Sequence, residues 1–544
     1  MKKLPIYISL LLLLTCAKDS TEDNSSVYVA PPTVTQYTLT VTAGEGGSVS
    51  TAGGTYDDGT SITITATPSE GYGFVGWSNG SIEESITITL NSNNTLTANF
   101  TVIFDGDYTV NRNNIQFNWR FNGFPSENHI RNTLVDVSPA FIYSYNDISY
   151  MINVGVTDDE SGLSTASSEP SPTIKFKKNE IGNWMFEKVY TDIYTWTCRS
   201  HKMVGNTITV QDGNEIGGDM KDWKGDIWHG EIGSSGNISW VKANSDQYRG
   251  FMHGVGAGDI NGDGLIDVGS APGYWNNEEN KWQTAIYIQN PDKTFSWAGN
   301  LLEDDIVPFA VDFVDIVGDE RAEIIYGDYG SGDPSIDTEL NQIRIFSFND
   351  DSQKFELYYK SNQSDALWDV GMGANQTRSY DFNNDGIQDI TSWRADYLGE
   401  GFDIFLGNSD GTFSAHFSKF FPAGTLNSSE FQVFDANNDG YLDILFEGFG
   451  NGSLFRIDPS NQYESNHGIK LNNMIWLNNG DGTFTNVENL QLTIDQPFSE
   501  FNFYPKYIIP YKDQNKLHFL AIPQNFDFNG DMISFDLYDI QINL

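Results

Sequence analysis

The stretch DINGDGLID, Asp259 to Asp267, decides the fold of this chain because near copies of it return at a regular interval. The copies DFNNDGIQD at 381–389 and DANNDGYLD at 435–443 keep identical residues at positions one, three, five, six and nine. A degraded copy, DIVGDERAE, lies at 315–323. Counted from the first aspartate of each copy, the four stretches begin 56, 66 and 54 residues apart. An interval of this length suits one four-stranded sheet of a repeated β architecture.

A second motif alternates with the first and has the pattern of a β-hairpin: an apolar strand, an Asn/Asp-Gly turn and then Thr-Phe. It reads IFLGNSDGTFSAH from Ile404 and IWLNNGDGTFTNV from Ile475, and a degraded copy, IYIQNPDKTFSWA, begins at Ile286. The Asp-Gly pair suits two residues at positive φ, as a two-residue hairpin turn requires. One nine-residue stretch and one hairpin therefore make up one cycle of strands.

The cycle can be continued beyond the clean copies, and it then gives seven units. Segments near 130–190, 191–248 and 497–544 have a suitable length, and residues 102–120 can complete the last unit. The repeats resemble FG-GAP/VCBS repeats, the blades of integrin-α-type β-propellers, most strongly from about 250 to 490. The resemblance implies an all-β fold with a seven-bladed β-propeller over residues 102–544. Ring closure of this kind leaves few exposed sheet edges.

The segment before the propeller alternates apolar residues with Thr or Ser. YTLTVTAGEGGSVS, GTYDDGTSITITATPSEGYGFVGWS and LTANF follow one another between Gln36 and Phe100. The period of two predicts strands, and GEGG, DDGT and NSNN predict turns. This order resembles a divergent internalin-type B repeat (the Listeria–Bacteroides repeat), which implies a small β-rich stalk module of bacterial surfaces at residues 36–101. Trp77, in FVGWS, is expected in its core.

Oxygen-bearing side chains at alternate positions of the three clean stretches predict a calcium site in each. Calcium takes six to eight oxygen ligands at about 2.3–2.6 Å. Positions one, three, five and nine supply side-chain oxygens, the carbonyl at position seven can add another, and the glycine at six permits a sharp reversal. The expected metal ligands are Asp259, Asn261, Asp263, Leu265 and Asp267; Asp381, Asn383, Asp385, Ile387 and Asp389; and Asp435, Asn437, Asp439, Tyr441 and Asp443.

An EF-hand is excluded by two features of these stretches. It needs a bidentate glutamate at position twelve and helices on both sides. Ser270, Ser392 and Phe446 stand at position twelve, and the sequences that follow are strand-like. The alternative for a single copy is an acidic turn without metal, because Asp, Asn and Gly are common turn residues. Magnesium is less suited, since it prefers fewer protein ligands and ideal octahedral geometry.

The degraded stretch leaves its metal binding open. Asp315, Asp319 and Glu323 remain, but Val317 replaces the amide at position three and Glu320 replaces the glycine at position six. A further acidic segment, DFNGD from Asp527, has Phe at position nine and is expected to form a hairpin turn.

The N-terminus has the pattern of a bacterial export signal. Two lysines precede a short apolar run that ends in Leu-Leu-Thr-Cys16, which resembles a lipobox with cleavage before Cys16 and lipidation of its thiol. We expect a lipoprotein signal peptide at 1–15, a polar tether at 16–35, and a lipid anchor to the outer membrane, at the cell surface. AKDSTED after the cysteine resembles surface-export signals of Bacteroidetes lipoproteins. An ordinary signal peptide with an incidental cysteine is the alternative.

Charge and cysteine content restrict the partners. The formal net charge of −44 argues against a nucleic-acid partner, because phosphate binding needs clustered Lys and Arg. Removing residues 1–15 takes away two lysines and leaves 28 − 74 = −46. With Cys16 lipidated, Cys198 has no disulfide partner, and we expect it buried in a strand rather than binding metal with His201.

Function is the least determined property of the sequence. It contains no nucleophile elbow, zinc-protease motif or phosphate-binding glycine loop, so no catalytic residue is assigned. A calcium-stabilised surface protein that binds glycan or protein ligands, or serves in adhesion, is the first hypothesis. Its candidate platforms, with blade packing as the alternative role, are Trp223, Trp228, Trp275, Trp282 and Trp393.

A polysaccharide-degrading enzyme is the alternative, because some polysaccharide lyases use seven-bladed propellers with calcium sites. Lyases need a His/Tyr/Arg cluster to remove a proton beside a uronate. The candidates are Arg199, His201, His229 and Tyr248, whereas His253 is expected to pack at a blade start. A structure in which these four residues line one pocket would support the enzyme hypothesis, and a structure in which they are dispersed would argue against it.

Overall fold

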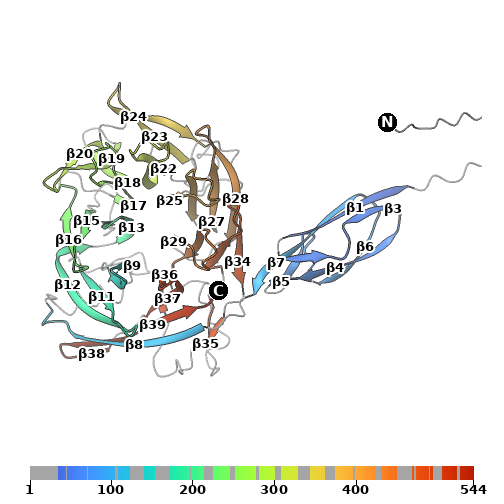
Figure 1. Ribbon diagram of the computed structural model, residues 1–544, viewed down its shortest axis with the longest axis horizontal. Helices are drawn as coiled ribbons and strands as arrows, with labels where there is room; N and C mark the ends of the chain where they lie inside the picture. The colour runs from blue at the N-terminus through green and yellow to red at the C-terminus, as the bar shows by residue number, and fades with distance from the viewer. Residues whose placement is uncertain are drawn as a thin grey trace, which may run out of the picture. The chain divides into compact units, whose positions relative to one another are not determined.

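The computed structural model describes most of the chain from residue 35 onward. The described ranges are 35–44, 46–69, 72–81, 83–103, 108–122, 140–153, 171–195, 198–212, 225–245, 251–276, 281–299, 308–328, 343–361, 374–395, 399–422, 430–449, 468–470, 473–488, 491–493, 505–523 and 527–544. The regular elements in these ranges are all β-strands (Figure 1). No helix in them has the length and apolarity needed to span a bilayer. Two compact units span residues 1–67 with 76–99 and 68–75 with 100–544.

The first unit consists of short strands with one buried face. Leu39 and Val41 are buried at alternate positions of one strand, while the threonine hydroxyls of Thr42 and Thr97 face outward 2.9 Å apart. Trp77 is buried and its indole N–H donates to the carbonyl of Glu83 over 3.0 Å, so the expected core position is confirmed. The strands between residues 36 and 103 are β1 (Gln36–Ala43), β2 (Gly47–Val49), β3 (Gly53–Asp57), β4 (Ser61–Pro68), β5 (Tyr72–Trp77), β6 (Ser85–Thr89) and β7 (Asn94–Ile103).

The second unit is a β-propeller, as predicted. Among the described residues, five four-stranded antiparallel sheets and a group of four strands in each of two larger sheets follow one another around a ring (Figure 1), and we number these groups blades 1 to 7 in chain order. The first six blades consist of β9 (Ala140–Tyr145), β10 (Ile148–Asn153), β11 (Ser171–Lys178) and β12 (Trp184–Thr195); β13 (Cys198–Val204), β14 (Thr207–Asp212), β15 (Ile227–Ile232) and β16 (Ile238–Lys242); β17 (Phe251–Gly258), β18 (Asp267–Asn276), β19 (Lys281–Gln289) and β20 (Phe295–Trp297); β21 (Pro308–Val314), β22 (Glu323–Asp328), β23 (Ile343–Asn349) and β24 (Lys354–Lys360); β25 (Ala374–Tyr380), β26 (Asp389–Ala395), β27 (Gly399–Gly407) and β28 (Phe413–Pro422); and β29 (Phe431–Phe434), β30 (Asp443–Phe446), β33 (Ile475–Asn478) and β34 (Phe484–Glu488).

Blade 7 combines strands from both ends of the propeller sequence. Its order is β36 (Pro505–Asp513), β37 (Lys516–Pro523), β39 (Met532–Ile542) and then β8 (Tyr108–Asn118). β8 pairs with β39 along its whole length, from Tyr108 with Ile542 to Asn118 with Met532. The prediction that residues 102–120 complete the last blade is therefore confirmed. Short additional strands are β31 (Gly448–Phe449), β32 (Gly468–Lys470), β35 (Gln491–Thr493) and β38 (Asp527–Asn529).

Apolar side chains pack between neighbouring blades and hold the ring together. Ile286 of blade 3 packs with Val311 and Ile324 of blade 4, in strands rich in the β-branched residues that suit such surfaces. Gly269 in blade 3 is required because a Cβ there would collide with the ring of Phe313 in blade 4. The core therefore lies between blades, and the loops are left at the two faces of the ring.

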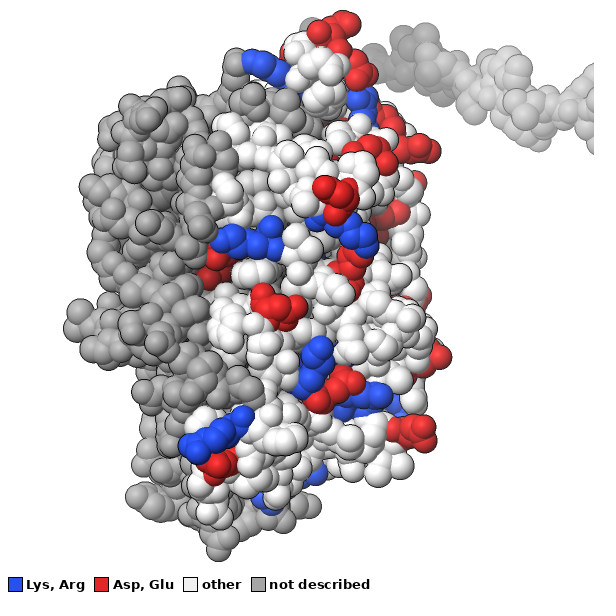
Figure 2. Space-filling model, turned by 90° about the vertical axis from the view of Figure 1, so that its left-hand side faces the viewer, with Lys and Arg blue, Asp and Glu red and all other residues white. Residues whose placement is uncertain are grey.

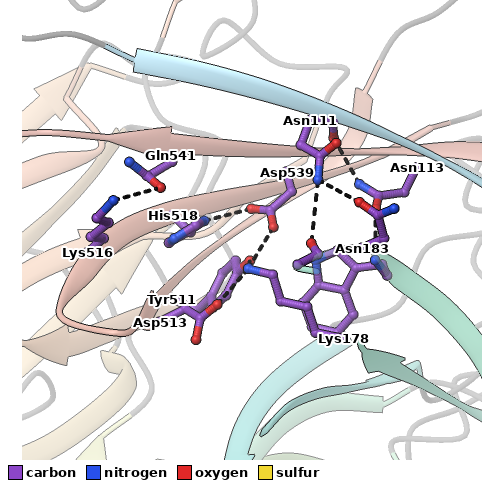
Figure 3. A network of polar contacts seen from close by, with 12 residues as sticks. Asn111, Asn113, Lys178, Asn183, Tyr511, Asp513, Lys516, His518, Asp539 and Gln541 are labelled. Atoms are coloured by element: carbon purple, nitrogen blue, oxygen red, sulfur yellow. Dashed lines mark hydrogen bonds and ion pairs between the residues drawn. The ribbon is translucent and has the colours of Figure 1, made fainter. Parts of the chain in front are cut away.

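The seam between blades 7 and 1 contains a buried polar network (Figure 3). Lys178 of β11 places its Nζ 2.6 Å from an Asp513 oxygen and 2.9 Å from an Asp539 oxygen. His518 Nδ1 lies 2.9 Å from the other Asp539 oxygen, and Lys178 Nζ donates to the Tyr511 hydroxyl over 3.1 Å. Burial raises the pKa of Asp539, but His518 and Lys178 together lower it below its ordinary value. One lysine of blade 1 thus joins two carboxylates of blade 7.

The hairpin turns differ from the two-residue type that the Asp-Gly pairs predicted. Gly411 N donates to Asn408 O over 2.9 Å, and Asn408 N donates to Thr412 O over 2.8 Å. Gly411 has φ 82°, whereas Asp410 is not among the residues at positive φ. This is a type I turn followed by a left-handed glycine, a three-residue loop. The carboxylate of Asp410 accepts from the Thr412 hydroxyl over 2.6 Å, which explains the Asp-Gly-Thr sequence.

Candidate functional site

The four nine-residue stretches occupy the same place in blades 3, 4, 5 and 6. Each connects the first strand of its sheet to the second: β17 to β18, β21 to β22, β25 to β26 and β29 to β30. Because the first strands run in the same direction around the ring, the four loops lie on one face of the propeller, which we call the loop face. No helix flanks any of them, so the exclusion of an EF-hand is confirmed.

The aspartate at position one shapes the loop through backbone hydrogen bonds. Asp259 Oδ1 accepts from the amides of Gly262 and Asp263 over 2.7 and 3.1 Å, and its Oδ2 accepts from Gly264 over 2.6 Å. Asp381 accepts in the same way from the amides at positions five and six, over 3.1 and 2.9 Å. Asp435 does so over 3.2 Å in both cases. The chain is thus curled around this carboxylate.

Positions three and five form a second pair in each clean loop. Asn261 Nδ2 donates to Asp263 Oδ2 over 3.1 Å, and Asp263 Oδ1 accepts from the amide of Leu265 over 2.9 Å. The corresponding amide-to-carboxylate distances are 3.0 Å from Asn383 to Asp385 and 2.8 Å from Asn437 to Asp439. Asp385 and Asp439 also accept from the amides of Ile387 and Tyr441, over 2.8 and 2.9 Å.

The aspartate at position nine is buried beneath the loop. Asp267 Oδ2 accepts from the amide of Ile260 over 3.0 Å, and its Oδ1 accepts from the amide of Gln289 in β19 over 2.8 Å. Burial raises the pKa of Asp267 to about 7, and the carboxylates of Asp263 and Asp259 add to the rise. Burial also raises the pKa of the equivalent Asp389 to about 6 and of Asp443 to about 7. This residue therefore fastens the loop to the third strand of its blade.

The donor set suits a hard divalent cation. Each clean loop contains three carboxylates and one amide oxygen, and the mutual repulsion of the carboxylates contributes to the raised pKa of Asp267. In the described ranges no three His, Cys, Asp or Glu side chains converge into a preformed metal cluster. A cation at the loop centre would therefore also need the amide oxygen at position three and the carbonyl at position seven, as calcium coordination commonly does.

Position four has a role that the sequence reasoning missed. Asn384 and Asn438 have φ of 56° and 63°, a left-handed conformation that glycine provides in the first loop. The side-chain amide of Asn384 donates to the carbonyl of Gly440 in blade 6 over 3.0 Å. Asn438 donates likewise to the carbonyl of Asn515 in blade 7 over 2.9 Å. The Asn-Asn dipeptide at positions three and four was the available signal, since Asn tolerates this conformation.

The two described histidines of the predicted lyase cluster lie on β13 and β15 of blade 2, opposite Val210 and Thr209 of β14, and therefore face opposite sides of the sheet. His201 places Nδ1 3.1 Å from Glu430 Oε2 and stacks on Phe141 at a centroid distance of 4.7 Å. His229 is buried on β15, where its Nδ1 lies 2.9 Å from the hydroxyl of Thr209, and burial lowers its pKa to about 4. The two histidines share none of these partners. Tyr248 and the side chains of Arg199 and His253 lie outside the described residues.

The tryptophan platforms are corrected in one case. Trp393 is fully buried and packs on Phe446 at a centroid distance of 4.7 Å, so it belongs to the core rather than to a binding surface. Trp228 packs against the apolar cluster between blades 1 and 2. Trp223 and the side chains of Trp275 and Trp282 lie outside the described residues. Cys198 is buried at the start of β13, as expected, and burial raises the pKa of its thiol.

Charged side chains also meet across the centre of the ring. Arg378 of blade 5 donates from Nη2 to the carbonyl of His201 in blade 2 over 3.2 Å and lies 3.6 Å from Glu430. Lys202 of blade 2 pairs with Asp312 of blade 4 over 2.8 Å. Because blades 2 and 5 are not neighbours, these contacts join inner strands from opposite parts of the ring.

A pocket of about 100 Å³ opens between the inner strands β9, β29 and β36. Ser144, Gln432 and Lys512 contribute polar groups to its lining, and Phe434 and Ile509 contribute apolar surface. Lys512 also donates from Nζ to the backbone carbonyl of Asp435, the first residue of the loop in blade 6. The pocket is therefore on the loop face, beside that loop.

The charge on one side of the molecule is finely mixed. Figure 2 shows Lys and Arg side chains singly or in small groups, next to Asp and Glu, and no continuous basic surface among the described residues of that face. Basic groups are also paired elsewhere among the described residues, such as Lys293 with Glu231 and Lys202 with Asp312. The described residues of this face therefore present no extended basic surface of the kind that binds a polyanion.

Comparison with known proteins identifies two repeat families in the chain. A family model described as divergent InlB B-repeat domain matches residues 37–104, and one described as FG-GAP-like repeat matches residues 381–446. Both resemblances drawn from the sequence are thereby confirmed. No curated protein gives a significant match. A crystal structure of a protein from Lactobacillus plantarum is similar over 57% of this chain and 80% of its own, with 9% identity and a TM-score of 0.35.

Proposed function

We propose that this protein is a calcium-stabilised lipoprotein of the cell surface whose propeller binds an extracellular glycan. The observation that carries the proposal is the pocket between β9, β29 and β36, which lies beside the loop at 435–443 and shares Lys512 with it. A ligand in this pocket would contact a part of the ring whose geometry depends on the loop. The polar tether at 16–35 would hold the folded part of the chain away from the membrane.

The lining of the pocket favours a sugar over an extended protein surface. A hydroxyl, a carboxamide and an ammonium group stand beside the ring of Phe434, a combination that can bond sugar hydroxyls and cover an apolar sugar face. A volume of about 100 Å³ admits part of one small ring, whereas a stable protein interface needs about 1,200 Å² of buried surface. A protein ligand is the second candidate, with the pocket taking one side chain.

A glycan array, run with the full chain in calcium and in excess chelator, tests the proposal. Ser144→Trp should abolish binding, because Ser144 is exposed at the pocket and a tryptophan would fill it. Ser234→Trp, at an exposed turn of blade 2, is the matched control and should bind normally. Equal binding by both variants, or no glycan bound in either condition, would overturn the assignment of this pocket.

The lipid anchor is part of the same proposal and has its own test. Cys16 lies outside the described residues, and the motif Leu-Leu-Thr-Cys supports it as the lipidated residue. Labelling of cells with a radioactive fatty acid should mark the wild-type chain and leave Cys16→Ser unlabelled. Digestion of intact cells by an added protease should remove the propeller if it faces outward.

The enzyme alternative has no supporting observation among the described residues, since His201 and His229 have separate partners. A screen for new unsaturated ends on uronate-containing polysaccharides remains its direct test. Accumulation of such ends with the purified chain would replace the binding proposal by a lyase.

A further inference from the structure

The loop of blade 4 carries an arginine at the position where the other three loops have Leu265, Ile387 and Tyr441. Arg321 is position seven of the degraded stretch, next to Glu320, which replaces the usual glycine and has φ of 72°. A non-glycine residue in this conformation is strained. The loop therefore keeps its shape although Val317 and Glu320 replace the asparagine at position three and the glycine at position six, the residues expected to favour that shape.

The backbone of this loop follows the same hydrogen-bond scheme as the clean loops. Asp315 Oδ1 accepts from the amides of Gly318 and Asp319 over 2.7 and 3.2 Å, and its Oδ2 accepts from Glu320 over 3.0 Å. Asp319 Oδ1 accepts from the amide of Arg321 over 3.0 Å. The position-nine Glu323 is buried and accepts from the amide of Ile316 over 2.7 Å.

One partner differs between this loop and the others. In the clean loops the amide of the position-three asparagine donates to Oδ2 of the position-five aspartate, over 2.8–3.1 Å. Val317 stands at position three here and is 40% exposed, and its side chain has no polar group that could donate to Asp319. Arg321 Nη2 instead donates to Asp319 Oδ2 over 3.0 Å. The guanidinium thus holds the same oxygen and also brings a positive charge to the loop.

Arg321 is itself fixed in several directions. Its Nη1 and Nη2 donate to the two oxygens of Asp350 in the β23–β24 turn, over 2.9 and 3.3 Å. Its guanidinium carbon lies 5.6 Å from the ring centre of Phe348, a cation–π distance. Its stem packs on the first loop, where a Cβ at Gly262 would approach Arg321 Cγ to 3.0 Å. The side chain of Arg321 is therefore fixed by contacts with other parts of the protein.

We infer that Arg321 replaces the cation in the loop of blade 4, so that this loop takes no metal and the propeller binds three calcium ions. The amide at position three is missing from the donor set, and the position-five carboxylate is already neutralised by a group that the chain supplies. A planar guanidinium with several donors suits such a fixed pairing with carboxylates. The inference rests on the proposed calcium binding of the other loops.

Calcium stoichiometry of the full chain, measured by equilibrium dialysis with metal analysis, tests the inference. The wild type should bind three ions. The variant Val317→Asn/Glu320→Gly/Arg321→Leu, which rebuilds the sequence pattern of positions three, six and seven in the first loop, should bind four. Arg321→Gln alone should still bind three, because it restores neither the amide nor the glycine. Four ions in the wild type, or three in the triple variant, would overturn the inference.

Thermal unfolding separates this inference from the calcium proposal itself. Arg321→Gln should lower the melting temperature by roughly 2 °C to the same extent in calcium and in chelator, because the charge it removes is part of the chain. Asp385→Asn, in a clean loop, should lower the melting temperature much more in calcium than in chelator. A wild type that binds no calcium would refute the calcium proposal, and an Arg321→Gln variant as stable as wild type in chelator would refute the role of Arg321.

Discussion

At the scale of single residues, the first aspartate of each loop accepts hydrogen bonds from backbone amides and so shapes the loop without any cation. Asp435 accepts from the amides of Asp439 and Gly440, and its own carbonyl accepts from Lys512. An alanine at this position would lose the loop geometry together with the charge. An asparagine keeps one oxygen acceptor and removes the charge, so asparagine variants report on cation binding more cleanly than alanine variants do.

The hydrogen bond from position four to the next blade gives a prediction with a built-in control. Asn438→Gly should destabilise the propeller by about 1 kcal/mol, because it removes the bond to Asn515 and leaves the left-handed backbone unstrained. Asn438→Ala should cost about 1 kcal/mol more, since it adds the strain of φ near 63°. Urea unfolding followed by tryptophan fluorescence measures both. Equal stability of the two variants would show that the backbone conformation carries no cost.

His201 predicts a pH dependence at the centre of the ring. Burial, the largest single influence, lowers the pKa of His201, but Glu430 and Glu447 raise it more than Arg378 opposes, so the pKa lies above its ordinary 6.5. A histidine with a raised folded pKa stabilises the fold fully below the unfolded pKa, and this contribution is lost as pH rises through the folded pKa. The stability difference between wild type and His201→Gln should therefore shrink from pH 6 upward in thermal melts.

His229 provides the opposite case and serves as the control. Its pKa is lowered to about 4 by burial, so its unfolded form binds more protons between pH 4 and 6.5. Its contribution is present above 6.5 and lost as pH falls toward 4. The difference between wild type and His229→Gln should accordingly grow with pH over that window. If the stability difference from wild type changed with pH in the same direction for His201→Gln and His229→Gln, the environments assigned to the two histidines would be contradicted.

At the scale of the element, the repeated loops and hairpins were predictable because each depends on residues close together in sequence. The Asp-Gly-Thr turn was recognised, but its type was wrong: one left-handed glycine and the Asp410–Thr412 contact were enough. Alternate spacing predicted cation ligands at positions one and five, but it did not predict that these carboxylates accept hydrogen bonds from the backbone of the loop. The role of Asn438 at position four was hidden, because its partner Asn515 lies in another blade.

The seam between blades 7 and 1 was beyond sequence reasoning. Lys178 and Asp513 are separated by 335 residues, and nothing in either strand distinguishes them from surface charges. Figure 3 shows Lys178, Asp513 and Asp539 converging from β11, β36 and β39. Only the closure of the ring brings them together, so the period of the repeats predicted that a seam exists but not which charges lie in it.

Lys178 gives a prediction at this scale. Lys178→Met should destabilise the propeller by about 3–5 kcal/mol, because it leaves the buried carboxylate of Asp539 and the partly buried one of Asp513 without their cation. Lys177→Met, the neighbouring and less buried lysine of the same strand, should cost less than about 1 kcal/mol. Chemical unfolding of the two variants beside wild type decides the matter. Similar losses would mean that the seam contributes no more than a surface charge.

At the scale of the whole molecule, the acidic composition and the ring architecture act on the same face. The chain has a net charge of −44, and the nine carboxylates of its three clean loops gather on the loop face. Self-repulsion of this kind destabilises a compact state. The loops also link neighbouring blades, since Ala322 of blade 4 donates its amide to the carbonyl of Asp259 in blade 3 over 2.7 Å. A change in one loop is thus transmitted to its neighbour through the backbone.

Removal of calcium should therefore lower the stability of the ring as a whole. Each site occupied at one hundred times its dissociation constant stabilises the folded state by about 2.7 kcal/mol, so three sites together contribute about 8 kcal/mol. Calorimetric melts of calcium-loaded protein with and without excess chelator should differ by many degrees, and magnesium should restore little of the difference. A variant with asparagine at Asp263, Asp385 and Asp439 is the control, because it should melt at the same temperature in both conditions. An unchanged wild-type melt in excess chelator would show that the loops are acidic turns, held by their backbone hydrogen bonds alone.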